Sequence, residues 1–353
     1  MNPLMSKLMK ATSVVGASVL ADSSFFNAKN QVTTSMPILN AAFSGELDGG
    51  FAPGITVISG ESKTFKSALT LFSLKAYLDK YEDSVGIIYD NEYGITPAYI
   101  KSFGIDPSRV IHIPFEHIEQ LKFDFVKKLE ELKAGDHVFF MVDSIGQASS
   151  KKEVEDAHDE KSVADMTRAK AIRSFLRLIT VQLTKKELPC FLINHVYVEI
   201  GAMYPKTIIP GGTAMTYVAN QIFVITKSQE KGSDGEIEGW HFNINIHKSR
   251  SVKEKSKFTF TVMYEQGIVR YSGLLDLALE SGLVQKPKQG WYVLVNPETG
   301  ELGEKNFRAK EFDTVYAPKL VKETKFKEFV KNRFQLTAMH VVDAEPESED
   351  LED

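Results

Sequence analysis

Short apolar runs alternate with longer amphipathic stretches along the middle of the chain. Each run is rich in β-branched or aromatic residues and is polar at its C-terminal end, which is typical of a buried strand. The runs are ITVIS (55–59), VGIIY (85–89), VIHI (110–113), HVFFMV (137–142) and PCFLIN (189–194). Between them, apolar residues recur at helical spacing near 67–80, 96–103, 117–133 and 163–186. This alternation predicts an α/β fold with a mostly parallel sheet flanked by helices.

After Tyr217 the pattern changes to the alternation of half-buried strands. The segments QIFVITKSQ, WHFNINIHKSR and KFTFTVMYE, with a Gly/Ser/Asp loop at 231–235, predict antiparallel strands that extend the sheet. Ahead of the first core strand, a helical pattern runs through Leu20. We therefore expect an N-terminal helical arm at 1–30, a core at 31–270, a small α+β subdomain at 271–335 and a tail at 336–353.

The composition of the 353-residue chain is that of an ordinary globular protein, with 43% hydrophobic and 25% charged residues. The single cysteine, Cys190, excludes a disulfide framework and a cysteine-rich zinc site, and it fits a reducing compartment. No apolar run approaches the ~20 residues that span a bilayer. We therefore expect a cytoplasmic protein with no membrane partner.

The strongest local motif follows the first apolar run and opens a helical stretch. It reads GESKTFKS and matches the phosphate-loop pattern G-x-x-x-x-G-K-[ST], except that Phe65 replaces the second glycine. The motif predicts phosphate contacts from backbone N–H groups and from Lys66, and a Mg²⁺ contact from Ser67. Phe65 then needs a tolerable backbone conformation or a distorted loop. The alternative is a Ser/Lys-rich strand-to-helix turn. The predicted nucleotide-binding residues are Gly60, Glu61, Ser62, Lys63, Thr64, Phe65, Lys66 and Ser67.

Further polar side chains follow other predicted strands. Asp143 comes directly after HVFFMV, where a carboxylate holds the Mg²⁺ shell of a phosphate loop, while Asp90 and Glu92 follow VGIIY, where a carboxylate can activate water. Asn194 and His195 end the fifth run, where a γ-phosphate could be contacted. A lone acid after a strand is more often a helix N-cap, and a lone histidine is more often structural. The convergence of these strand ends beside a phosphate loop favours the functional interpretation.

Two segments suit contact with single-stranded nucleic acid. Residues 196–213, VYVEIGAMYPKTIIPGGT, lack clear periodicity and mix apolar, aromatic and basic side chains with paired glycines. A second polar loop, 149–161, leads into a helix on which Lys170, Arg173 and Arg177 form a basic stripe. A solvated helix face is the alternative explanation of the stripe.

These motifs, in this order, resemble the RecA/Rad51 recombinase superfamily. The similarity covers nearly the whole chain, from FFNAKN through the phosphate loop and WHFNINIHKSRSVKEKSKF to YSGLLDLALESG. It implies a RecA-like P-loop ATPase core. It also implies that Lys66, Ser67, Asp143 and Glu92 carry out nucleotide binding and hydrolysis, with Ser67 and Asp143 as metal ligands. Tyr99 matches the residue that stacks on adenine, and His195 stands where a glutamine usually couples the γ-phosphate to DNA.

The resemblance also implies residues that act between subunits and on DNA. Lys248 and Arg250 fall where the family reaches the ATP of a neighbouring subunit, which makes them catalytic candidates together with Glu92 and Lys66. Phe25 and Phe26 would pack on the next protomer, or alternatively within their own chain. The DNA-binding loops would be about 149–167 and 196–213. Their candidate residues, with the adjoining helix, are Arg168, Arg173, Ile200, Met203, Gly211 and Gly212.

The function that these features favour is ATP-dependent homologous recombination. The protein would form filaments on single-stranded DNA and exchange strands with homologous duplex DNA, using ATP and Mg²⁺. Its partners would be single- and double-stranded DNA, other copies of itself, a single-strand-binding protein and a recombination mediator. One alternative is a hexameric RecA-like helicase, which would form closed rings. Another is a nonenzymatic mediator, against which the presence of Glu92 argues.

The formal net charge of −5 is concentrated at the C-terminus. The last eleven residues, DAEPESEDLED (343–353), hold seven carboxylates, and without them the chain has 42 basic and 40 acidic residues, a net charge of +2. An acidic tail on a nearly neutral body could compete with DNA phosphate for basic loops, or could simply keep the protein soluble.

Deletion of residues 343–353 tests the competition. We expect the truncated protein to bind duplex DNA more tightly than the full chain, most strongly at low salt, because screening weakens the tail's competition. Binding isotherms at several salt concentrations measure this effect. Equal affinities at every salt concentration would indicate a solubilising tail.

Overall fold

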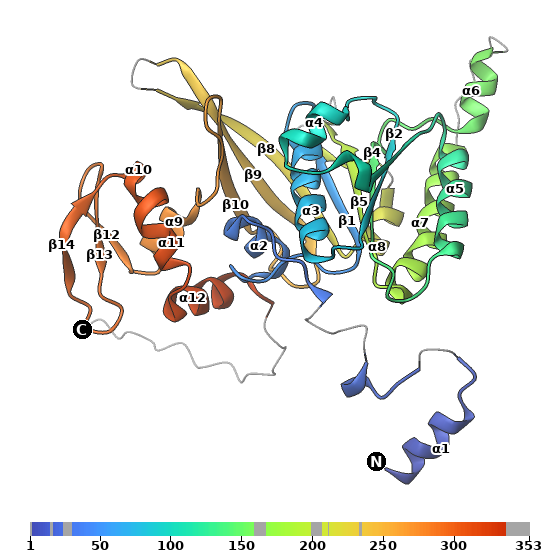
Figure 1. Cartoon of the computed structure of the whole chain (residues 1–353), viewed down its shortest axis with the longest axis horizontal. Coiled ribbons are helices and arrows are strands. Elements are labelled where there is room, and N and C mark those ends of the chain that lie inside the picture. Colours follow the sequence, from blue (N-terminus) through green and yellow to red (C-terminus); the bar gives the residue numbers. More distant parts are fainter. Residues whose placement is uncertain are drawn as a thin grey trace, which may run out of the picture.

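The computed structural model describes residues 2–14, 17–23, 30–158, 167–198, 207–210, 212–232 and 235–336. A nine-stranded sheet with the strand order β11-β10-β9-β8-β1-β5-β4-β2-β3 forms its centre (Figure 1). The strands predicted from the apolar runs are all present and pair in parallel. They are β1 (Gly54–Gly60), β2 (Val85–Asp90), β3 (Val110–Pro114), β4 (Val138–Asp143) and β5 (Pro189–His195).

Helices cover both faces of this sheet. On one face, α2 (Pro37–Ser44), α3 (Lys66–Lys80) and α4 (Pro97–Ser102) contribute to one hydrophobic cluster. On the other face, α5 (Ile118–Glu131), α7 (Thr167–Lys185) and α8 (Gly212–Val218) form a second cluster. Neighbouring residues of β4 show why its apolar run is continuous. Phe139 belongs to the first cluster and Phe140 to the second, because successive strand residues point to opposite faces.

The second half of the sheet is a long meander. β8 (Gln221–Lys231) pairs parallel with β1, and β9 (Ile237–Ser249), β10 (Lys257–Met263) and β11 (Gly267–Val269) follow in antiparallel order. The predicted antiparallel extension is therefore correct for β9 to β11, whereas β8 continues the parallel part. In Figure 1 the β8–β9 hairpin extends well beyond the body of the sheet.

The C-terminal residues form the predicted α+β unit, which packs on the core. The aromatic rings of Phe258 in β10 and Phe334 lie 4.5 Å apart, and the unit shares the first hydrophobic cluster. Its elements are α9 (Leu274–Glu280), β12 (Val284–Lys288), β13 (Trp291–Val295), β14 (Leu302–Phe307), α10 (Ala309–Glu311), a π-helical turn (Phe312–Tyr316), α11 (Ala317–Leu320) and α12 (Thr324–Phe334). Within the described part of the chain, the strands of this unit pair with one another alone, as an antiparallel three-stranded sheet.

Two predicted segments differ in the structure. The polar loop expected at 149–161 contains a helix, α6 (Lys151–His158), in which lysines face glutamate or aspartate four residues later. Such pairs support a helix even where few residues are buried. The N-terminal helix α1 (Pro3–Ala11) ends before Leu20, which instead begins a short 3₁₀ turn (Leu20–Asp22).

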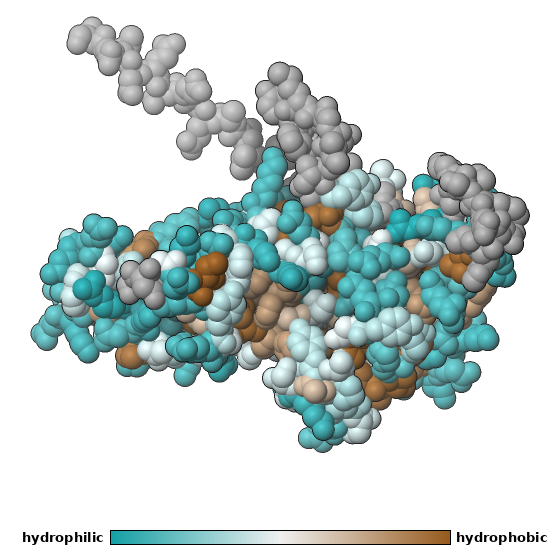
Figure 2. All heavy atoms as spheres, turned by 90° about the horizontal axis from the view of Figure 1, so that it is seen from above, coloured by the Kyte–Doolittle hydropathy of each residue, from teal (hydrophilic) through white to brown (hydrophobic). Residues whose placement is uncertain are grey.

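The surface seen in Figure 2 is mainly hydrophilic, with hydrophobic residues in separate smaller areas. Helix α1 lies apart from the core in Figure 1 and has no buried residue. Among the described residues, none of the helices combines the length and hydrophobicity needed to cross a membrane.

Replacing Phe191 with alanine tests the core. Phe191 of β5 is fully buried against Phe43, Phe51 and Phe139. We expect a loss of about 3–5 kcal/mol in the free energy of unfolding, measured by denaturant titration with circular dichroism. The control is Phe123→Ala, because Phe123 is 61% exposed and its loss should cost under about 0.5 kcal/mol. Equal effects of the two variants would contradict this packing.

Candidate functional site

The phosphate-loop motif lies between the end of β1 and the start of α3, as the sequence predicts. Helix α3 begins at Lys66, so its unpaired N–H groups face the loop. The ammonium of Lys66 donates a hydrogen bond to the Glu61 carbonyl at 2.6 Å, across the loop. A side chain at Gly60 would approach the Thr64 hydroxyl to 2.5 Å and the Ile225 carbonyl to 2.8 Å, so this position requires glycine. The Lys66 side chain therefore bridges the two ends of the loop.

Phe65, at the position of the second glycine, has a backbone conformation that favours glycine. Its φ is 66°, in the left-handed region, which costs roughly 1–2 kcal/mol for a residue with a side chain. Its ring packs against Phe242 of β9 and Phe260 of β10, with centroids 5.0 and 5.9 Å away. The loop thus turns through a left-handed residue at this position, and aromatic packing offsets the cost.

The predicted metal ligands contact each other directly. The Ser67 hydroxyl donates to a carboxylate oxygen of Asp143 at 2.6 Å. Burial raises the pKa of Asp143 to about 6, and the nearby charges of Glu92 and Asp90 act in the same direction. Burial also lowers the pKa of Lys66. An acid whose charge is disfavoured in this way gains most from a cation beside it.

The oxygen ligands of Ser67 and Asp143 suit a Mg²⁺ ion that is bound together with a nucleotide. Within the described ranges no group of three or more His, Cys, Asp or Glu side chains is placed to hold a metal ion. Mg²⁺ usually takes one or two protein ligands and completes its shell with phosphate and water. Polar side-chain atoms of Ser59, Ser144 and Asn194 are buried without hydrogen-bond partners around these strand ends. Ser67 and Asp143 therefore suit a phosphate-bound Mg²⁺ better than a metal site made by protein alone.

Glu92 is held by His195. The His195 Nε2 atom lies 2.8 Å from a Glu92 carboxylate oxygen and 3.2 Å from the Gln147 amide nitrogen. The loop that carries Glu92 is shaped by the buried Asp90, whose carboxylate accepts backbone N–H bonds from Glu92 and Tyr93. Asp90 thus has a structural role in the turn after β2, and Glu92 is the acid that faces the pocket.

These elements enclose one open pocket of about 350 Å³. Tyr99 forms part of its wall and packs edge-on against Phe103 with a centroid distance of 5.1 Å. The predicted nucleotide-binding residues Gly60 and Glu61, at the start of the loop, do not line the pocket. The lining residues are Ser62, Lys63, Thr64, Phe65, Lys66, Ser67, Ala68, Glu92, Tyr99, Asp143 and His195.

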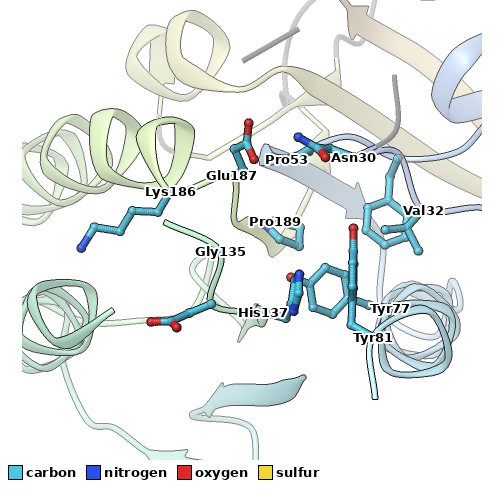
Figure 3. A pocket seen from close by; sticks show the side chains of 12 residues that line it. Asn30, Val32, Pro53, Tyr77, Tyr81, Gly135, His137, Lys186, Glu187 and Pro189 are labelled. Atoms are coloured by element: carbon cyan, nitrogen blue, oxygen red, sulfur yellow. The ribbon is translucent and has the colours of Figure 1, made fainter. Parts of the chain in front are cut away.

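A second, smaller cavity of about 50 Å³ lies at the opposite end of the sheet (Figure 3). It is lined by residues at the amino ends of strands, including Pro189 and His137, and by Tyr77 and Tyr81 of the α3 side. Its volume is far below that of a nucleotide site, and ligands of parallel sheets bind at the carboxyl ends of the strands. The larger pocket is therefore the candidate site.

Lys248 and Arg250 do not line the pocket of their own chain. The Lys248 ammonium instead donates to the Thr216, Tyr217 and Ala219 carbonyls at the end of α8. Burial lowers its pKa, and the nearby Arg250 charge adds to this. A role at the ATP of a neighbouring subunit remains a prediction for both residues.

The predicted DNA-binding residues differ in where they lie. The Arg168 guanidinium donates to the Ala148 carbonyl at 2.8 Å and to the Gly146 carbonyl, so it ties α7 to the loop after β4. Arg173 is exposed on α7 together with Lys170 and Arg177, as the helical spacing predicts. Gly212 begins α8. The residues Phe25, Phe26, Ile200, Met203 and Gly211, and the tail from 337, lie outside the described residues.

Several residues around the site are not among those predicted from the sequence. Gln147 contacts His195, and the Asn91 side chain accepts the Ser144 N–H at 2.7 Å. Lys227 of β8 donates to the Lys63 carbonyl at 3.1 Å. Polar residues just after β2 and β4 are a usable signal for Asn91 and Gln147. No local pattern marks Lys227, because its partner is remote in sequence.

The fold and this pocket together define an α/β protein of RecA-like architecture. The RecA N-terminal domain family matches residues 16–269, and the family described as Bacteriophage T4, Recombination and repair protein, C-terminal domain matches residues 271–330. The chain therefore belongs to the RecA recombinase family, and its C-terminal unit belongs to the phage T4 type. This membership confirms the resemblance inferred from the motifs.

Individual relatives agree with the family assignment. The Recombination and repair protein of Enterobacteria phage T4 is 45% identical, over 98% of this chain and 90% of the relative. Protein RecA of Acholeplasma laidlawii (strain PG-8A) is 27% identical, over 82% of this chain and 84% of the relative. Protein RecA of Streptomyces rimosus is 27% identical, over 74% of this chain and 67% of the relative. None of these similarities supports the hexameric helicase considered as an alternative.

Asp143→Asn tests the buried charge of the site. The pKa of Asp143 is about 6 in the folded chain, against 3.8 ordinarily, so at pH 8 the ionised carboxylate destabilises the folded state. We expect the variant to be more stable than the wild type at pH 8 by about 1–3 kcal/mol. The difference should shrink as the pH falls from 6 to 4, because Asp143 is then protonated in the folded chain. Thermal unfolding across this pH range measures it.

The control is Glu304→Gln, at an exposed position of β14, which should change the free energy of unfolding at pH 8 by under about 0.5 kcal/mol. A destabilised Asp143→Asn protein at pH 8 would contradict the expected cost of the charge.

Proposed function

We propose that the protein is an ATP-dependent recombinase that polymerises on single-stranded DNA and pairs it with homologous duplex DNA. The observation that carries the proposal is the single pocket that gathers Lys66, Ser67, Glu92 and Asp143 within a chain of the RecA family. Membership of the RecA family supports the fold, and the pocket adds separate support for the chemistry. The pocket supplies the residue types that ATP binding and hydrolysis require.

ATP would bind with its phosphates in the loop of β1 and α3. The N-terminal N–H groups of α3 and the Lys66 ammonium supply donors and positive charge. Lys66 would exchange its bond to the Glu61 carbonyl for one to phosphate. Ser67 and Asp143 would hold Mg²⁺, which when bound neutralises charge on the phosphates. Tyr99, on the pocket wall, suits contact with the adenine ring.

Glu92 would position the attacking water. A carboxylate that accepts a proton must have a free oxygen directed at the water, and in the structure one Glu92 oxygen is bonded to His195. His195 therefore restrains the base, and a change of its position would alter the activity of Glu92. This gives the histidine a link to hydrolysis as well as to DNA.

A continuous set of contacts supports coupling between the pocket and DNA. His195 contacts Gln147, and the carbonyls on either side of Gln147 belong to Gly146 and Ala148, which hold Arg168 at the start of α7. Arg173 lies on the exposed face of the same helix. A shift of His195 on nucleotide binding would therefore move the backbone that positions α7 and the preceding DNA loop.

Assembly into a filament would complete the site. Lys248 and Arg250 would reach the triphosphate of the adjacent subunit and stabilise charge during hydrolysis. Lys248 would first have to leave the carbonyls at the end of α8. In the cell we expect the filament to work with a single-strand-binding protein and a mediator, in the cytoplasm.

Two substitutions test the catalytic roles. Lys66→Ala should reduce ATP hydrolysis to background, because phosphate loses its buried cation. Glu92→Gln should reduce turnover at least about 100-fold while the protein retains ATP and stays on DNA. Steady-state ATPase and filter-binding assays measure both. Glu82→Gln, at an exposed position, is the matched control, and an unchanged rate in Glu92→Gln would contradict the assignment of the base.

Negative-stain microscopy with single-stranded DNA and a slowly hydrolysed ATP analogue tests the assembly. Helical filaments are the expected result. Closed rings, or the absence of any assembly, would overturn the proposed function.

A further inference from the structure

Three neighbouring strands present a row of side chains on one face of the sheet. Lys227 of β8 lies opposite Phe242 of β9, and Phe242 lies opposite Phe260 of β10. Residues directly opposite in antiparallel strands point to the same face. We call Lys227, Phe242 and Phe260 the cross-strand row.

The phosphate loop lies on this row. The Lys227 ammonium donates to the Lys63 carbonyl at 3.1 Å, and the Phe65 ring packs on Phe242 and Phe260 at centroid distances of 5.0 and 5.9 Å. Lys63 and Phe65 are also the residues of the loop that have side chains and a positive φ, of 59° and 66°. The row therefore holds the loop at the points where its backbone is least favourable.

The bond from Lys227 also orients a peptide group of the loop. In a trans peptide the carbonyl and the following N–H point in opposite directions. Because Lys227 draws the Lys63 carbonyl toward the row, the Thr64 N–H points away from the row. Backbone N–H groups of such loops bind phosphate, so the direction of this group matters for the nucleotide.

Lys227 is itself held in place. Its ammonium lies 4.5 Å from the centroid of the Trp240 ring, and the Trp240 indole donates to the Tyr264 hydroxyl at 2.9 Å. Trp240 is two residues from Phe242 in β9 and so lies on the same face. Lys227 does not line the nucleotide pocket, so its effect on a nucleotide must pass through the loop.

We propose that the cross-strand row positions the phosphate loop for nucleotide binding and that Lys227 is a positioning residue. The inference rests on the proposed ATP-binding function. It explains why phenylalanine can occupy a glycine position here: the ring provides the anchor that joins the loop to β9 and β10. The left-handed turn is then stabilised from outside the loop.

Lys227→Met tests the positioning role. Loss of the bond frees the Lys63 peptide, so we expect the KM for ATP to rise about tenfold while kcat changes less than about twofold. Lys227→Arg should restore KM to within about twofold of the wild type, because it can still donate to the carbonyl. The matched control is Lys231→Met, an exposed lysine on the same strand, and it should leave both constants unchanged.

Tryptophan fluorescence provides a spectroscopic test. The loss of the nucleotide-induced signal in a Lys227 variant is not expected if Lys227 has a merely structural role. The chain has two tryptophans, Trp240 and Trp291, so Trp291→Phe leaves Trp240 as the only indole emitter. In that protein, binding of Mg-ATP should change the Trp240 emission, because the loop, Lys227 and the ring are in contact. In the double variant with Lys227→Met the change should disappear at saturating nucleotide.

Phe65→Gly provides an independent test of the aromatic half of the row. Removing the anchor should raise the KM for ATP several-fold, although glycine restores the common motif. Wild-type KM values in both Lys227→Met and Phe65→Gly would overturn the proposal, with ATP binding itself intact. Failure of the wild-type chain to bind ATP would instead overturn the proposed function.

Discussion

The parallel pairing of β1, β5, β4 and β2 is the constraint on which the candidate site depends. Its register places Gly60 beside His195, and Asp90 beside Asp143. Residues remote in sequence therefore meet at one edge of the sheet. Hydrophobic clusters on both faces keep this register, because a slip by one residue would move the side chains of each strand into the opposite cluster, where the packing does not match them.

At that edge, polar groups of the chain are bonded to one another. Lys66 donates to the Glu61 carbonyl, Ser67 donates to Asp143, and Glu92 is paired with His195. In the proposed function, a nucleotide that takes these donors and acceptors has to replace existing bonds. The net free energy of its binding would then be much smaller than the number of new contacts suggests.

The parallel strands could be predicted from the sequence, because buried strands have local patterns. Lys66, Asp143 and His195, predicted from motifs and strand ends, line one pocket in the structure, and their roles stay predictions. The sequence could not place Lys227, whose contact with Lys63 depends on the meander that brings β8 beside the loop. Nor could it show that Lys248 contacts the end of α8 within its own chain. Helix α6 was missed because its residues are polar and its support comes from charge pairs.

The left-handed turn at Phe65 has a consequence for how the sequence of this loop can vary. Replacing Phe65 alone with glycine would leave a gap beside Phe242 and Phe260. Replacing Phe242 and Phe260 with smaller residues would expose the Phe65 ring while its backbone keeps the unfavourable left-handed conformation. Substitutions at position 65 and at the two strand positions are therefore expected to occur together. A motif search that requires glycine overlooks such loops, whereas correlated aromatic residues on the adjoining strands would reveal them.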